Sequence, residues 1–449
     1  MRLQLRGVGN IGTLVVILCI GSGFSTPAAA QSYVPGEILV KFRPGVSQAA
    51  ADQFRAARGI QLLEAIPSSG VQRVAIPAGS TIAEMVEQCG ADPDCEYAEP
   101  NYIGQGGFVP NDTSFSLQWH HNNTGQTGGT PDADIDGTEC WDTSRGNAAI
   151  RIAVLDTGID GDHPEFAGRI LPGYDAVNED NDPEADHSHG PYVTGIAAAN
   201  ANNSFAVAGV DHFVSIVPVK VLNSSNAGTS FDLAQGLDFA DDEAEVISMS
   251  LINYPTGSFT INNALQAARD AGAILIACAG NGGIGDADVS GPGASPLTIS
   301  VGATNDDDER ASFSGTGSAL DIVAPGSSVR TIAYNTSADT TTTFSGCSAA
   351  TPIVGGMATL LLSVDPTLTH DEIATILTTT ADDRVGPPGE DTPGRDDFFG
   401  YGRVNLNAAL AAVSVQVPSG SPLAFAVLIA CLIGIAWSVD GRTHRERIP

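Results

Sequence analysis

Between residues 150 and 301, short and mostly apolar segments alternate with segments whose apolar residues recur at helical spacing. The apolar segments are 150–155, 214–221, 246–249, 273–278 and 297–301, and their length suits strands buried on both faces. Helical spacing is found in 231–241 and 262–271. This alternation predicts an α/β domain whose mainly parallel sheet is covered by helices on both faces.

Residues 31–103 have a different pattern and are predicted to form a separate small domain. Segments 34–42 and 71–76 alternate apolar and polar residues, as half-buried strands do, and 48–58 has the spacing of a short helix. Their combination within such a short stretch predicts an α+β domain ahead of the larger one.

The first 30 residues have the features of an export signal peptide. Two arginines lie within the first six residues, residues 11–20 are apolar, and three alanines precede Gln31 as a cleavage site. An uncleaved anchor is the alternative, although the apolar segment is short for a membrane span. Export predicts an extracytoplasmic protein, in a compartment where disulfides form.

The C-terminal end carries a second apolar segment. The large domain is expected to cover 111–413, and a linker at 414–422 leads into the nearly continuous apolar residues 423–439. Residues 440–449 contain three arginines, which suits a cytoplasmic tail. We therefore expect a C-terminal transmembrane or sorting segment that attaches the protein to the membrane, with a buried core helix as the alternative.

Composition narrows the classes of partner. A chain of 449 residues with 42% hydrophobic residues can form two or three domains with substantial cores. Its 20 Lys and Arg against 52 Asp and Glu give a formal net charge of −32. This acidity argues against nucleic-acid binding, because the chain repels other acidic polymers, and it suits calcium ligation or a saline habitat, with a merely solvated acidic surface as the alternative.

Five cysteines remain when those of the two terminal apolar segments are set aside. Cys89 and Cys95 flank a short turn-rich loop, so they are predicted to pair with each other in an oxidising compartment. Cys140, Cys278 and Cys347 are odd in number, so at least one of them stays free or pairs between chains.

Three short motifs carry candidate chemistry. They are Val-Leu-Asp-Thr-Gly at Asp156, Ser-His-Gly at His189 and Ser-Gly-Cys-Ser at Ser348. A serine hydroxyl needs an imidazole to accept its proton and a carboxylate to hold that imidazole, so the three residues are candidates for nucleophile, base and acid. Taken singly, each motif is also typical of an ordinary strand end or turn. Asp156 ends a predicted strand, while Ser348 precedes a predicted buried helix at 349–362.

The order Asp, His, Ser on an α/β scaffold resembles the subtilisin-like serine proteases (peptidase S8-type, similar to thermitase and subtilisin) from about residue 111 to 413. The resemblance implies a three-layer subtilisin-like fold and an endopeptidase that acts on proteins or peptides through an acyl-enzyme. Asn281, in Ala-Gly-Asn-Gly, corresponds to the family's oxyanion donor, together with the backbone N–H of Ser348. The corresponding substrate-binding residues are Ser250, Leu251, Ile252 and Gly280.

The small domain resembles the I9-like inhibitory propeptide of the same family. Its ending, Tyr-Ala-Glu-Pro-Asn-Tyr at 97–102, is similar to the family's propeptide ending. The resemblance implies a ferredoxin-like α+β fold, a role as intramolecular inhibitor and folding aid, and a zymogen that is cut between Asn101 and Pro110.

The resemblance also implies structural Ca²⁺ at two places. One is the acidic loop before His189, with Asp175, Asn178, Asp180 and Asp182 as candidate ligands. The other combines Asp112, Glu165 and Asn203, where Glu165 stands in place of the family's usual aspartate. Oxygen donors on turn-rich loops suit a hard cation, and a merely solvated acidic turn is the alternative for both.

Several positions depart from the family pattern. Pro191 and Tyr192 follow the candidate base, Ile252 and Asn253 replace two glycines, and Cys347 stands beside the candidate nucleophile. A catalytically weak or inactive pseudoprotease that acts as a binding or chaperone-like protein is therefore a second hypothesis. A cysteine protease using Cys347 is a further alternative, although Ser348 aligns with the family's serine. A retaining glycosidase is a third hypothesis, but it would need a positioned pair of carboxylates, and the sequence indicates none.

Overall fold

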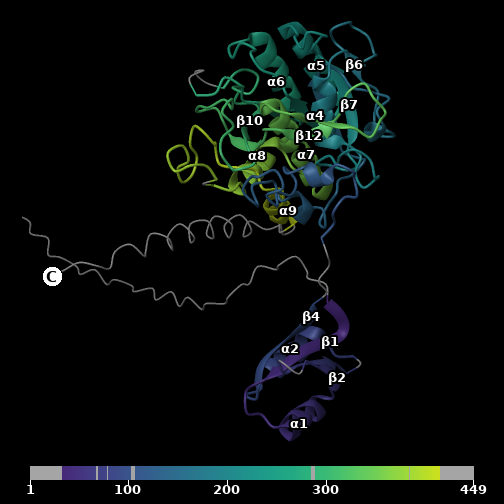
Figure 1. The fold of residues 1–449 in the computed structure, drawn as a ribbon, viewed down its shortest axis with the longest axis vertical. Helices are drawn as coiled ribbons and strands as arrows, with labels where there is room; N and C mark the ends of the chain where they lie inside the picture. Colours follow the sequence, from purple (N-terminus) through teal and green to yellow (C-terminus); the bar gives the residue numbers. More distant parts are fainter. Residues whose placement is uncertain are drawn as a thin grey trace, which may run out of the picture. The chain divides into compact units, whose positions relative to one another are not determined.

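The computed structural model describes residues 33–66, 69–77, 79–102, 107–284, 289–383 and 385–414. The predicted export signal lies outside these residues, as do the apolar segment, the basic tail and the linker beyond residue 414. The chain divides into two compact units, Met1–Gly104 and Gln105–Pro449. Figure 1 shows the helices and strands of both.

The N-terminal unit is a four-stranded antiparallel sheet with two helices. In chain order its elements are β1 (Tyr33–Phe42), α1 (Gln48–Arg58), β2 (Gln61–Ala65), β3 (Val71–Ala75), α2 (Ile82–Gly90) and β4 (Cys95–Tyr102). The strand order β2-β3-β1-β4 gives this βαββαβ unit a ferredoxin-like topology. Ile38, Phe54, Val74 and Met85 belong to its core.

The predicted Cys89–Cys95 disulfide is wrong. Both cysteines are free and buried in the small hydrophobic core, Cys89 from α2 and Cys95 from β4. The thiol of Cys95 donates to the backbone O of Tyr97 at 3.1 Å. Burial raises the pKa of the Cys89 thiol to about 11. The spacing across the loop gave no information about this packing.

The C-terminal unit is built on one seven-stranded parallel sheet. Its strands are β5 (Arg151–Asp156), β6 (Tyr174–Asp175), β7 (Ser215–Lys220), β8 (Val246–Met249), β9 (Ile274–Cys278), β10 (Ile299–Thr304) and β11 (Ile322–Pro325). The order is β11-β10-β9-β8-β5-β7-β6, and every ladder is parallel. The predicted parallel sheet is confirmed.

Successive residues of β5 enter two different cores. Ile152 and Val154 pack in one cluster, whereas Ala153 and Leu155 pack in the other. The helices α5 (Ser230–Glu243) and α6 (Phe259–Ala271) contribute to the second cluster, while α4 (His189–Ala198) and α7 (Cys347–Val364) contribute to the first. The result is the predicted three-layer α/β fold (Figure 1).

Several elements surround these layers. They are η1 (Phe115–Leu117), α3 (Gly137–Cys140), η2 (Pro164–Phe166), the antiparallel pair β12 (Val329–Ile332) and β13 (Thr341–Phe344), α8 (His370–Thr379) and α9 (Leu406–Ser414). Among the described helices, α7 alone is long and apolar enough to cross a membrane, but 89% of it is buried in the protein. It is therefore accounted for as the central core helix.

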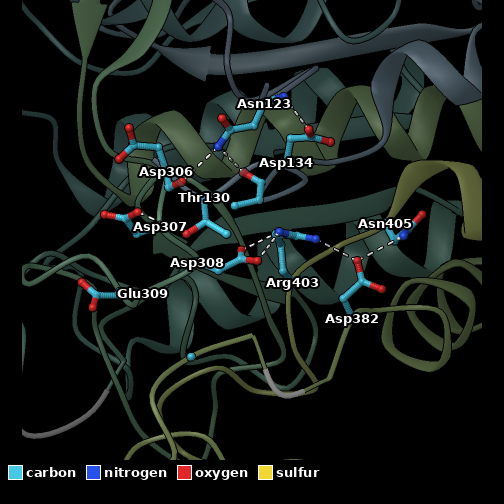
Figure 2. A network of polar contacts seen from close by, with 12 residues as sticks. Asn123, Thr130, Asp134, Asp306, Asp307, Asp308, Glu309, Asp382, Arg403 and Asn405 are labelled. Carbon is cyan, nitrogen blue, oxygen red and sulfur yellow. Dashed lines mark hydrogen bonds and ion pairs between the residues drawn. The ribbon is translucent and has the colours of Figure 1, made fainter. Parts of the chain in front are cut away.

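A polar network fixes the segment that ends the sheet domain (Figure 2). The Arg403 guanidinium donates to both carboxylate oxygens of Asp308, at 2.5 and 2.6 Å, and to Oδ2 of Asp382 at 3.0 Å. The amide of Asn405 donates to the same Asp382 oxygen. The backbone of Arg403 also bridges to Val323 of β11. These contacts join the C-terminal segment to the edge of the sheet.

Candidate active site

The carboxylate of Asp156 holds the imidazole of His189. Asp156 is the last residue of β5 and is fully buried, and His189 is the first residue of α4. Nδ1–H of His189 donates to Oδ1 of Asp156 at 2.7 Å, and the same oxygen accepts the Thr157 N–H. Because Nδ1 carries the proton of this bond, Nε2 is the nitrogen available as a base.

The start of α4 is fixed against the end of β5. The N–H of Gly190 donates to the Thr157 hydroxyl at 2.8 Å, and this hydroxyl donates to the backbone O of His187. A Cβ at residue 190 would lie 2.1 Å from the carbonyl oxygen of Gly158, so the close approach requires glycine. This contact brings His189 within reach of Asp156.

The pKa of His189 is raised by its surroundings. Burial acts to lower it, but the negative charge of Asp156 and the hydrogen bond to it outweigh burial. The site therefore favours the imidazolium that forms when the ring accepts a proton. This is the electrostatic arrangement that a general base for serine attack needs.

An aromatic side chain from β13 covers the imidazole. The Phe344 ring packs edge-on against His189, with ring centroids 5.3 Å apart, and the Tyr192 ring also packs against Phe344, with centroids 5.6 Å apart. Pro191 occupies the first turn of α4, where a helix needs no intrahelical N–H donor. The two departures after His189 are thus accommodated without separating His189 from Asp156.

Ser348 lies in the first turn of α7, beside the residue that follows β8. Its hydroxyl donates to the backbone O of Ser250 at 3.4 Å, and the Ser250 hydroxyl donates to the backbone O of Ser348 at 3.0 Å. His189, Ser348 and Asn281 all line one cavity of about 630 Å³. The structure therefore brings the predicted acid, base, nucleophile and oxyanion donor together.

Asn281 is oriented by a backbone donor. It follows β9, and its side chain accepts the N–H of Cys347 at 2.9 Å. A backbone N–H can only donate, so the accepting atom is Oδ1 and the Nδ2 group is the donor side of the amide. Asn281 lines the cavity, which gives that donor access to a bound substrate.

The predicted substrate-binding residues lie in two different positions. Ser250, Leu251 and Ile252 line the cavity, whereas Gly280 is not part of the lining and its N–H donates to the Cys347 sulfur at 3.2 Å. Asn253, which stands where the family has glycine, has φ 66°, a left-handed conformation that asparagine tolerates. The chain keeps a glycine-like backbone there but adds a side chain.

Three features of the site were missed by reasoning from the sequence. Phe344 and Tyr254 both line the cavity, and Cys278 forms a disulfide with Cys347, which leaves Cys140 free. The disulfide was signalled by position, because each of its cysteines lies within three residues of a residue that must enter the site. The aromatic residues belong to no recognised motif.

A buried lysine supports the strand ends below the site. Lys220, the last residue of β7, is 1% exposed. Its ammonium donates to the backbone O of Thr157 and of Leu222, and to the Asp186 carboxylate at 2.6 Å. The charge is therefore paired, and it ties the segment after Asp156 to that after β7.

One of the two predicted calcium sets converges. The Asn203 amide donates to Glu165 at 2.9 Å and its backbone N–H donates to Asp112 at 3.4 Å. Both carboxyl groups are buried, and burial raises the pKa of Glu165 to about 8 and that of Asp112 as well. Buried oxygen donors in this arrangement fit a hard cation. The described residues include no group of three or more His, Cys, Asp or Glu that could hold a metal ion.

In the acidic loop before His189, the Asp175 carboxylate forms hydrogen bonds with other residues of the same loop. Oxygens of Asp175 accept the N–H groups of Val177 and Asn178 and the Asn178 side-chain amide. Asp180 accepts the N–H of Asp182, and both of these residues are exposed. Asp175 therefore closes the turn, which leaves the predicted second calcium set without a gathered group of free oxygens.

Comparison with known proteins agrees with this geometry. Residues 147–402 match the model of the subtilase family, and residues 23–101 match that of the fervidolysin N-terminal prodomain. The chain belongs to the subtilase family, as the sequence predicted. It is a subtilisin-type serine endopeptidase with an N-terminal prodomain.

Two relatives and one solved structure illustrate the similarity. A thermophilic serine proteinase of Bacillus sp. (strain AK1) is 33% identical over 377 residues, which cover 83% of this chain and 87% of the relative. Thermitase of Thermoactinomyces vulgaris is 34% identical, covering 68% and 99%. A protease structure from Pseudoalteromonas arctica PAMC 21717 matches with a TM-score of 0.61 at 29% identity, covering 68% and 100%.

Proposed function

We propose that Asp156, His189 and Ser348 form the catalytic triad of this endopeptidase. The observation that carries the proposal is the 2.7 Å bond from His189 to buried Asp156, in the same cavity as Ser348. His189 would accept the Ser348 proton as Oγ attacks the scissile carbonyl, and would then give it to the leaving amine. Water, activated by the same imidazole, would hydrolyse the acyl-enzyme and restore Ser348.

The nucleophile must turn before it reacts. The Ser348 hydroxyl donates to the backbone O of Ser250 at 3.4 Å, which is a long bond between oxygen atoms. A rotation about the Cα–Cβ bond exchanges this weak partner for the imidazole. Catalytic hydrogen bonds commonly tighten only when substrate fills the site.

Two donors are available for the oxyanion of the tetrahedral intermediate. Asn281 lines the cavity, and because its Oδ1 accepts the Cys347 N–H, its Nδ2 group is the donor available to a substrate. The N–H of Ser348 is among the first N–H groups of α7, which have no partner within the helix. The positive end of the α7 dipole adds to their effect. In subtilisin, loss of one such donor lowers kcat by about 10²–10³.

The substrate is proposed to be a protein or peptide bound in extended form. The cavity runs between the segment 226–228 and the residues Ser250, Leu251 and Ile252. Ile252 and Tyr254 present bulky side chains at this wall, so narrow selectivity for the residues before the scissile bond is expected. Cleavage of a peptide library by the mature enzyme measures that selectivity.

A serine-directed fluorophosphonate tests the triad. Wild type is expected to be labelled, and Ser348→Ala is expected to lose both label and peptidase activity. Ser345→Ala is the matched control, because Ser345 also lines the cavity. This variant should still be labelled, since it keeps Ser348. Wild type that is folded and processed but is not labelled would instead support the pseudoprotease hypothesis.

We further propose that the prodomain inhibits the enzyme until cleavage between Asn101 and Pro110, after export directed by residues 1–30. Residues 423–439 would attach the protein to the membrane or direct its sorting. The prodomain match and its ferredoxin-like topology support the inhibitory role. N-terminal sequencing of secreted wild type should find a start within 102–110, and Ser348→Ala should retain the prodomain. A mature wild type that starts at Gln31 would contradict this.

A structural calcium ion is proposed at Asp112, Glu165 and Asn203. Two buried carboxylates with an amide are stabilised by a cation, so a chelator should lower the melting temperature of wild type. At free Ca²⁺ of 100 times Kd the ion contributes about 2.7 kcal/mol to the free energy of unfolding. In Glu165→Gln this chelator shift should vanish, whereas Asp182→Asn, in the exposed loop, should keep it. An unchanged wild-type melting temperature would contradict the proposal.

A further inference from the structure

The disulfide between Cys278 and Cys347 joins the two segments that carry the oxyanion donors. Cys278 is the last residue of β9, three residues before Asn281, and Cys347 is the first residue of α7, directly before Ser348. The two Cα atoms are 5.3 Å apart, and both side chains are fully buried. The cross-link therefore lies within the protein rather than on an exposed loop.

Two hydrogen bonds connect the same segments. The N–H of Gly280 donates to the sulfur of Cys347 at 3.2 Å, and the N–H of Cys347 donates to Oδ1 of Asn281 at 2.9 Å. Cys347 thus holds the β9 segment through its sulfur and orients the amide of Asn281 through its backbone. Its position determines both where Asn281 points and where the Ser348 N–H begins.

The N-cap residue of α7 has no side chain with which to cap the helix. This residue, Gly346, has φ 143° and supplies no side-chain cap bond. Helices commonly secure their first turn with the side chain of the N-cap residue, and in α7 the first N–H is held instead by Oδ1 of Asn281, from another segment. The covalent bond at the next residue joins that same segment to the helix.

We propose that the Cys278–Cys347 disulfide is a positioning element of the active site, which sets the separation between the Asn281 amide and the Ser348 N–H. The proposal rests on the oxyanion roles proposed above. Stabilisation of the oxyanion depends on donors already aimed at the developing charge, and a misplacement of about 1 Å can cost about 10²-fold in rate. The substrate-lining residues Leu251 and Ile252 belong to another segment, so the effect falls mainly on kcat.

Cysteine variants of the full-length protein, allowed to mature, test this role. In Cys278→Ala the covalent bond is lost while the Cys347 sulfur can still accept from Gly280. We expect kcat to fall about 10-fold or more, with KM within about twofold of wild type. Cys347→Ala and the double variant should lose at least the same factor, because they break the same bond and also remove the sulfur that accepts the Gly280 N–H. Cys140→Ala, which removes a buried free thiol, is the matched control and should keep the wild-type kcat.

A merely structural staple would lower only the melting temperature. Each variant is therefore assayed at a temperature at which circular dichroism shows it folded. A lower melting temperature with unchanged kcat would overturn the proposal.

A cycle with Asn281→Ala separates positioning from a general effect. In wild type this substitution should cost about 10²–10³ in kcat, and in Cys278→Ala it should cost clearly less, because the donor is already misplaced. Equal costs in both backgrounds would overturn the proposal. Wild type that is neither labelled by fluorophosphonate nor active would contradict the proposed triad, whereas labelled and active wild type with fully active cysteine variants contradicts only the positioning role.

Discussion

His189 lies between a carboxylate and an aromatic ring, and these two neighbours act on different properties of the imidazole. Asp156 fixes which nitrogen carries the proton and raises the pKa, while Phe344 limits the tilt of the ring. Tyr192 supports Phe344 from the next turn of α4. Tyr192 thus departs from the family pattern, yet it packs against the ring that contacts His189.

Asp156→Asn should expose the electrostatic part of this arrangement. The neutral amide neither holds the required tautomer nor stabilises the imidazolium, so kcat should fall by about 10⁴. In the proposed triad, His189 would act as a base in its neutral form. Its raised pKa therefore predicts that, as the pH falls, activity is lost at a higher pH than for an ordinary imidazole. In the variant, the remaining activity should persist to lower pH. A pH profile of kcat/KM measures both effects.

Asp160→Asn is the control for that profile. Asp160 follows in the same loop and is also buried, but its carboxylate accepts the Asn335 N–H rather than the imidazole. In Asp160→Asn, kcat/KM should fall at low pH as it does in wild type. The same fall in Asp156→Asn would contradict the assignment of Asp156 as the partner of His189.

At the scale of elements, the sequence predicted the helices and strands whose burial produces a recognisable pattern of apolar residues. All the residues of β8 and β9 are buried, which produces the continuous apolar segments that were read as strands. The five residues of β2 are all exposed, so they leave no such trace. The helix α8 was also missed, although it begins with a capping box formed by Thr369 and Glu372. The apolar pattern does not report pairing across the fold, as between Cys278 and Cys347; only the positions of these cysteines beside Asn281 and Ser348 indicated it.

Loss of the buried Arg403 should destabilise the fold more than loss of Arg269, whose partner is exposed. Removing the buried guanidinium in Arg403→Ala leaves Asp308 and Asp382 without their partner and should lower the free energy of unfolding by about 3–5 kcal/mol. Burial already raises the pKa of Asp308 to about 6. Because its charged form is then disfavoured, the loss should be larger at pH 8 than at pH 5. Denaturant unfolding at both pH values checks this.

Arg269→Ala provides the comparison. Arg269 pairs with Asp371, whose side chain is 85% exposed, so the cost should stay below about 1 kcal/mol. Similar losses in the two variants would show that the network in Figure 2 contributes no more than a surface pair.

For the whole molecule, acid stability depends on histidines that the mechanism does not use. His121 and His212 are buried against Trp141, and His120 is buried against His121. Burial lowers the pKa of all three, that of His121 to about 4. Each is neutral when folded, so its contribution is complete above pH 6.5 and is lost as the pH falls below that value, where the unfolded chain binds the proton. Asp134 and Asp211, with pKa raised to about 6 by burial, act in the opposite direction.

His120→Met should isolate the histidine contribution. Among the residues that the structure describes, neither ring nitrogen of His120 has a hydrogen-bond partner, and the ring is fully buried. An apolar side chain of similar volume should therefore cost little stability at pH 7.5. The fall in stability between pH 6.5 and 4.5 should be smaller than in wild type. Urea midpoints across this range measure the difference, and parallel curves for the two proteins would exclude His120 as a source of acid lability.

Lys220 gives the catalytic unit an unusual surface chemistry. The only other lysine in the chain is Lys41, which lies in the prodomain, and Lys220 is enclosed by Thr157, Leu222 and Asp186. Once the prodomain has been removed, the folded enzyme would present a single reactive amine, at its new N-terminus. Amine-directed coupling would then attach the enzyme to a support at one point, and lysine-specific proteases would find no exposed bond to cut.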